Sequence, residues 1–181
     1  MNKATAGHGP TSRLALKWKR WRFHLSALLL ILPLAYLPRY FDNLALLSGV
    51  KGLGQRELGE LAVGPWSVRL AEWRVEAPRR DGAAGHMKAF TLAQCKECIG
   101  HIKAAYLRVG KPRSLRAAGA LFSGSPYRQM ASALIPEQTA PDAELWVTLE
   151  GWDGAVHQAS LPLAKASPTT VQWLTQRKGR P

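Results

Sequence analysis

The sequence is short of cysteine and contains none of the common catalytic motifs. Only Cys95 and Cys98 occur among 181 residues, which excludes the disulfide-dense framework of a small secreted scaffold. There is no G-x-S-x-G, no P-loop and no H-E-x-x-H, so common signatures of hydrolases, nucleotide-binding enzymes and zinc proteases are missing. The chain also lacks a second C-x-x-C pair and a C-x-x-C-H. The motifs of the sequence therefore do not indicate a reaction.

Acidic residues are absent from the first part of the chain, where basic residues gather. No Asp or Glu precedes Asp42, whereas six of the 25 basic residues precede Phe23. An uncharged run then extends from Phe23 to Pro38, with Trp and Tyr on its flanks. A membrane core needs about 20 mostly apolar residues, and aromatic and basic side chains at the ends can lie at the membrane–water interface. The sequence therefore predicts a transmembrane anchor over residues 21–41.

The charge asymmetry of this segment also predicts its orientation. Basic flanks stay on the cytoplasmic side, so residues 1–20 are expected to be a cytoplasmic stub and the rest to be exported. A cleaved signal peptide has a similar basic region and apolar core. No convincing small-x-small cleavage site follows the run, which favours an anchor. We expect a single-pass protein of a bacterial inner membrane with a periplasmic carboxyl-terminal domain.

The rest of the chain is long enough for one ordinary domain. Four glycines punctuate residues 42–63, which predicts a spacer with a short helix near residues 56–62. Short runs of alternating apolar and polar residues then predict a mainly β domain over residues 64–163. We expect a β-sandwich, with an immunoglobulin-like arrangement as one form. Residues 164–181 are predicted to be a tail with a short terminal helix.

The individual strands are predicted from this alternation. Residues 102–109 fit either a helix or a strand. Residues 144–161 give the clearest pattern, since two alternating runs are joined by Asp153-Gly154, a pair typical of a hairpin with a type I′ turn. Residues 66–76 are expected to form one bent strand or two short ones, since the alternation slips in phase near Ala71. The other expected strands are residues 87–93, 115–122 and 127–135.

The two cysteines belong to a C-x-x-C-x-x-H motif, formed by Cys95, Cys98 and His101. Three interpretations stay open: a local disulfide, a thiol-redox pair and a metal site. Thiolate and imidazole ligands suit zinc, copper or iron, and the motif does not distinguish among these metals. His86 and Met87 lie upstream and are candidates for a further ligand.

Basic residues remain in excess after the predicted stub. The exported part keeps 19 basic against 12 acidic residues, which favours anionic ligands or lipid headgroups as partners. No nucleic-acid reading motif is found, and export argues against a nucleic-acid partner. A solvated basic surface is the plainer interpretation of the same residues. The candidates for an anion-binding face are Arg79, Arg80, Lys111, Arg113, Arg116 and Arg128.

Several stretches are similar to a known type of protein. They are RWRFHLSALLLILP, GPWSVRLAEWRVE, CKECIGHIKAAYLRVGKPRS, SPYRQ and ELWVTLEGWDGAVHQASLPL. Together they resemble the small inner-membrane accessory protein of pyoverdine-uptake loci, which accompanies the reductase that releases iron from the ferric siderophore. The resemblance implies a non-catalytic role in periplasmic iron release, with the inner-membrane reductase, other membrane components of the uptake system and the lipid bilayer as partners. It also makes Cys95, Cys98 and His101 candidate iron or redox contacts.

Overall fold

The computed structural model describes residues 13–48 and 52–178 of the chain. These residues belong to two compact units, Met1–Ala45 and Leu46–Pro181. The long helix α1 (Arg13–Ser48) forms the first unit, and its last three residues are counted with the second.

Helix α1 has the length and composition of a membrane span. Residues His24–Ser48 are long and apolar enough to cross a membrane, and the apolar 18-residue stretch within them is not buried in the protein. Pro33 and Pro38 lie inside the helix, which is tolerated in membrane helices. The predicted apolar helix is confirmed, although it extends beyond residues 21–41 at both ends. The expected spacer is shorter than residues 42–63, since helix occupies the chain up to Ser48.

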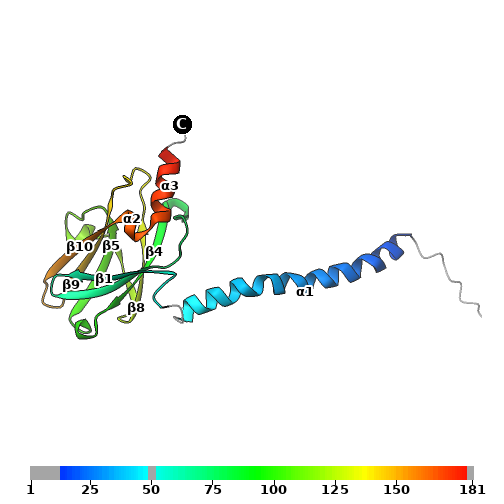
Figure 1. Ribbon diagram of the computed structural model, residues 1–181, viewed down its shortest axis with the longest axis horizontal. Coiled ribbons are helices and arrows are strands. Elements are labelled where there is room, and N and C mark those ends of the chain that lie inside the picture. The colour runs from blue at the N-terminus through cyan, green and yellow to red at the C-terminus, as the bar shows by residue number, and fades with distance from the viewer. Residues whose placement is uncertain (1–12, 49–51, 179–181) are drawn as a thin grey trace, which may run out of the picture. The chain divides into compact units, whose positions relative to one another are not determined.

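The second unit is built from two antiparallel sheets, which confirms the predicted mainly β fold (Figure 1). The first sheet has the order β1-β2-β4-β8-β7, with β3 paired to β4, and the second has the order β10-β9-β5-β6. The first sheet contains β1 (Arg56–Val63), β2 (Trp66–Glu72), β3 (Arg79–Arg80), β4 (His86–Gln94), β7 (Ser123–Ser125) and β8 (Arg128–Leu134). The second contains β5 (Ile102–Val109), β6 (Ala120–Leu121), β9 (Glu144–Gly151) and β10 (Val156–Pro162).

The core lies between the two sheets. Alternate residues of each central strand point inward, as Leu70 and Leu92 do from the first sheet and Val147 and Leu149 from the second. Helices α2 (Leu163–Ala166) and α3 (Pro168–Lys178) close the chain. Leu174 of α3 is buried in the same core, so the predicted tail is part of the domain. The predicted terminal helix is observed as α3.

Strand β1 occupies the region where a spacer and a short helix were predicted, and that prediction is wrong. Its register against β2 shifts between Glu57 and Gly59, where a bulge interrupts the alternation. Leu58 and Leu61 therefore both pack against the core although they are three residues apart. That spacing imitates a helical period, which explains why the sequence pattern was misleading.

Other local predictions differ in detail. Residues 102–109, which fitted either a helix or a strand, form the strand β5. Residues 115–122 were predicted to be one strand, but they contain a 3₁₀ turn, Leu115–Ala117, and the two-residue β6. The β9–β10 hairpin is confirmed, but its type I′ turn is wrong. Only Gly154 has positive φ there, and the Asp153 carboxylate accepts a hydrogen bond from the Ala155 N–H at 3.0 Å. A four-residue loop results.

Candidate anion-binding site

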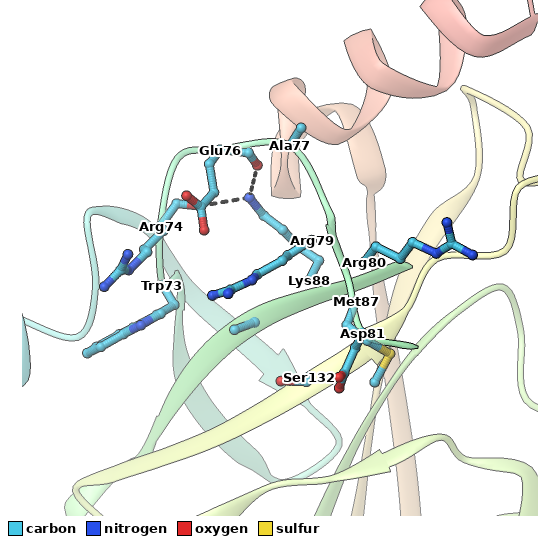
Figure 2. Close-up of a pocket in the computed structure, with 11 residues that line it drawn as sticks. Trp73, Arg74, Glu76, Ala77, Arg79, Arg80, Asp81, Met87, Lys88 and Ser132 are labelled. Atoms are coloured by element: carbon cyan, nitrogen blue, oxygen red, sulfur yellow. Dashed lines mark hydrogen bonds between the residues drawn. The ribbon is translucent and has the colours of Figure 1, made fainter. Parts of the chain in front are cut away.

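A pocket of about 470 Å³ lies beside the short strand β3 (Figure 2). Its walls come from the segment between β2 and β3, from β3 and the residue after it, from the start of β4, and from Ser132 of β8. Four basic residues line it against two acidic ones, Glu76 and Asp81. The basic residues are Arg74, Arg79, Arg80 and Lys88, and they share the wall with Trp73 and Met87.

Two of the arginines gather at one side of this pocket. Figure 2 shows Arg79 extending toward Arg74 and Trp73, whereas Arg80 extends in the opposite direction. Arg79 and Arg80 are both exposed and occupy neighbouring positions of β3, so their side chains are expected to alternate. Both arginines line the pocket, but strand geometry points their side chains in opposite directions, and only Arg79 extends toward Arg74 and Trp73.

Lys88 forms the buried wall of the pocket. Its side chain is only 3% exposed, and its Nζ lies 2.8 Å from Glu72 Oε1. It also donates a hydrogen bond to the carbonyl oxygen of Arg74 at 2.7 Å and another to that of Glu76. Its charge is therefore balanced within the fold, and it holds the segment that carries Arg74. The exposed Arg79 and Arg80 contribute positive charge at the pocket.

Glu72 is the fully buried partner of Lys88 and the centre of a polar network. Arg56 Nε donates to its Oε2 at 2.8 Å, and Ser167 Oγ donates to its Oε1 at 2.6 Å. Burial acts to raise the pKa of Glu72, but the hydrogen bonds from Lys88, Ser167 and Arg56 outweigh it and hold the pKa below its ordinary value. Ser167 precedes α3, so the network joins the sheet that carries the pocket to the carboxyl-terminal helices.

Acidification is expected to weaken the fold through Glu72. The pKa of Glu72 is lower in the folded chain than its ordinary value of 4.5, so the ionised carboxylate stabilises the fold at pH values above 4.5. This stabilisation is lost as the pH falls below 4.5 and through the lower pKa of the folded state. We expect the urea midpoint of the full chain to fall from about pH 5 downward. A Glu72→Gln variant should lack this part of the pH dependence. An unchanged slope in that variant would contradict the assignment.

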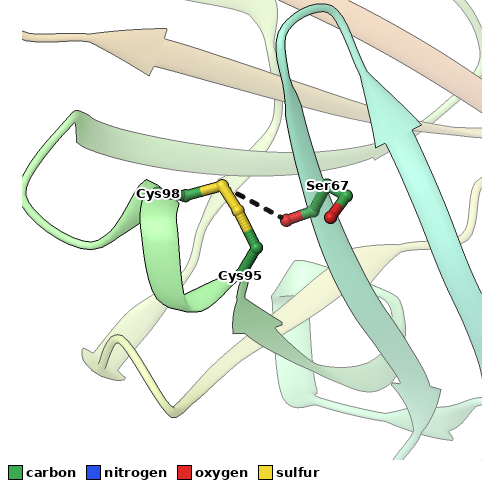
Figure 3. Close-up of a disulfide and its surroundings, with 3 residues drawn as sticks. All are labelled: Ser67, Cys95 and Cys98. Carbon is green, nitrogen blue, oxygen red and sulfur yellow. Dashed lines mark hydrogen bonds between the residues drawn. A yellow bond between two sulfur atoms is a disulfide. The ribbon is translucent and has the colours of Figure 1, made fainter.

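Cys95 and Cys98 form a disulfide directly after β4 (Figure 3). They bracket a 3₁₀ turn, Lys96–Cys98, and Cys98 is only 2% exposed. Cys98 Sγ lies 3.7 Å from the carbonyl oxygen of Ser67, on β2. A disulfide that closes so short a loop contributes about 2 kcal/mol by restricting the unfolded chain. Of the three interpretations of the motif, the local disulfide is the one that the structure contains.

The other proposed metal ligands do not join the cysteines. Within residues 13–48 and 52–178, no group of three or more His, Cys, Asp and Glu side chains is placed to hold a metal ion. His86 and Met87 begin β4 and Cys95 follows its end, so about 30 Å of extended chain separates His86 from Cys95. His101 is exposed, and its N–H donates to the Cys98 carbonyl at 3.0 Å. The structure therefore does not bring His86 and Met87 together with the cysteines.

His86 instead contacts the carboxyl-terminal helix. Its Nδ1 lies 3.5 Å from Glu137 Oε1, and its ring centroid lies 4.6 Å from that of Trp173. Arg177 Nη2 approaches the same carboxylate oxygen at 2.9 Å. These contacts give His86 a structural role next to the pocket, where it pairs with Arg80 across β3 and β4.

The six basic residues predicted as one face occupy different parts of the fold. Arg79 and Arg80 line the pocket. Arg128 lies over the Trp73 ring at 4.9 Å and donates hydrogen bonds to the carbonyl oxygens of Leu46 and Leu47. The remaining three, Lys111, Arg113 and Arg116, lie in the β5–β6 connection of the second sheet.

Two residues of the pocket were missed in the sequence. Trp73 and Arg74 were assigned to a predicted strand over residues 66–76, in which an arginine between apolar residues indicates an outward position. Strand β2 ends at Glu72, so both residues lie in the turn that forms the pocket wall. The phase slip near Ala71 was the available signal that the strand did not continue.

The family of the chain is given by a comparison with family models. One model matches residues 17–164, which cover α1 from Lys17 and the strands of both sheets. No curated protein and no solved structure matches the chain. The chain belongs to the family described as uncharacterised conserved protein UCP029505.

Proposed function

We propose that this protein is a membrane-anchored, non-catalytic accessory subunit that binds an anionic ferric siderophore, of the pyoverdine type, beside an inner-membrane reductase that releases the iron. The observation that carries the proposal is the pocket in which Arg74 and Arg79 lie beside Trp73. The siderophore and the reductase are taken from the resemblance of the sequence. The pocket supplies the chemistry that such a ligand requires.

The pocket suits an acidic group attached to a flat apolar one. A guanidinium presents a planar fork of donors that matches a carboxylate, and its hydrogen bonds to a charged acceptor are stronger than neutral ones. The indole of Trp73, which is 8% exposed and has Arg128 over its ring, forms an apolar part of the wall beside these donors. A volume of about 470 Å³ lies in the small-molecule range. We therefore expect the pocket to hold one acidic part of a chelate rather than the whole complex.

The proposed location is the inner membrane, with the β domain in the periplasm. The basic residues before Phe23 favour a cytoplasmic amino terminus. The Cys95–Cys98 disulfide supports an oxidising compartment for the second unit. A tethered domain is held near other membrane proteins, which raises its effective concentration at a reductase in the same bilayer.

The proposal predicts saturable binding of ferric pyoverdine to the full chain in lipid nanodiscs. Binding should change the tryptophan emission, since Trp73 lines the pocket, and should weaken with rising salt because the contact is ionic. An uncharged ferric hydroxamate chelate of similar size is the matched control and should bind much more weakly. Equal binding of both chelates, or no binding of either, would contradict the anion site. For the partner, purification from native membranes should recover the reductase with the full chain.

A further inference from the structure

The loops at one end of the sandwich are joined by backbone hydrogen bonds. The Gln94 N–H donates to the carbonyl of Pro126 at 2.9 Å, and the Trp152 N–H donates to that of His101 at 3.1 Å. Gln94 and His101 flank the disulfide loop, residues 95–98, on its two sides. The β7–β8 turn, the disulfide loop and the β9–β10 loop therefore meet at the same end of the second unit.

Two large aromatic side chains are exposed on these loops. Tyr127 is 68% exposed at the β7–β8 turn, and Trp152 is 69% exposed in the β9–β10 loop. Neither ring contributes to the core between the sheets. Trp and Tyr are the residues enriched at membrane–water interfaces, where an apolar ring with a polar edge is favoured at the depth of the headgroups.

The first residues of the second unit lie next to the β7–β8 turn. Leu46 and Leu47, in the last turn of α1, belong to the second unit, and their carbonyl oxygens accept hydrogen bonds from Arg128. Arg128 directly follows Tyr127 in the chain. From Ser48 to Leu53, which is buried in the second unit, the chain can extend at most about 18 Å. Only this short length of chain lies between the helix and the buried part of the β domain.

We propose that this end of the β domain lies in the interface of the bilayer that α1 crosses, with Tyr127 and Trp152 among the lipid headgroups. This inference rests on the membrane anchoring of the proposed function. Exposed charges at this end are of both signs, with Lys96 against Glu97 and Asp153 beside Trp152. The aromatic rings rather than anionic lipids therefore make the contact, and it does not require acidic headgroups or low salt.

Quenching by brominated lipid tests this position. The full chain is reconstituted in nanodiscs of phosphatidylcholine, either plain or brominated near the headgroup end of the acyl chain, and tryptophan emission is compared. Trp18 and Trp21 flank the span and report anchoring. We expect Trp152→Phe to remove on the order of one third of the quenched emission, since three interfacial rings contribute. Addition of phosphatidylglycerol or salt should leave this loss unchanged.

Trp146→Phe is the matched control because Trp146 is half-buried toward the other end of the same strand, β9. It should leave the quenched emission unchanged. Quenching that is the same in Trp152→Phe and the unmodified chain would overturn the interfacial position while leaving the anchor intact. Absence of quenching in every variant would overturn the anchor and the interfacial position together. Near-ultraviolet circular dichroism establishes that both variants are folded.

Discussion

Replacement of Glu72 with alanine is expected to lower the free energy of unfolding of the β domain by about 3–5 kcal/mol. Glu72 is fully buried, and Lys88 is 3% exposed. Removal of the carboxylate leaves the Lys88 ammonium buried without its partner, which is costly because that charge has been taken out of water. The variant also deprives Arg56 and Ser167 of an acceptor. The measurement is urea unfolding of the full chain in detergent, followed by near-ultraviolet circular dichroism.

Two further variants make this result specific. Glu60→Gln changes an exposed glutamate of β1 and should alter the free energy of unfolding by less than about 0.5 kcal/mol. The double variant Glu72→Ala/Lys88→Met should be more stable than the sum of the single changes predicts, because no unpaired charge remains. Additive losses in the double variant would show that the two residues do not stabilise the fold as a pair.

The sequence predicted the regular parts of the sandwich because their burial alternates with period two. Leu145, Val147 and Leu149 all face the core, and no bulge interrupts the β9–β10 pairing. The apolar helix was equally clear, since an uncharged run bounded by basic and aromatic residues is typical of a membrane span. These features depend on residues close together in the chain.

The features that were missed depend on distant residues or on one local irregularity. A bulge at Gly59 hid β1, since it shifts the alternation on which strand prediction depends. The pairing of Glu72 with Lys88 joins two strands, and the sequence between them gives no sign of it. The pair Arg79-Arg80 was recognised as an anion-binding candidate, but its partners Trp73 and Arg74 become neighbours only because the chain turns after β2.

The Arg79→Glu variant is expected to weaken binding of ferric pyoverdine by about 100-fold. Arg79 extends into the pocket toward Arg74, so the change removes a donor to the ligand and places a negative charge where the ligand carries one. Hydrogen bonds to charged groups contribute about 1.5–3 kcal/mol, and like-charge repulsion adds to the loss. The dissociation constant is measured by titration of the full chain in nanodiscs, with tryptophan emission as the signal.

Arg80→Glu is the matched control for this prediction, because it makes the same change in net charge at the neighbouring position of β3. Arg80 also lines the pocket but extends away from Arg74 and Trp73, so its replacement acts mainly through the screened field and should change the dissociation constant by less than about threefold. The contrast separates a specific site from a general attraction to a basic domain. Equal weakening in both variants would mean that ligand binding follows net charge alone, and the pocket would then have no particular role in recognition.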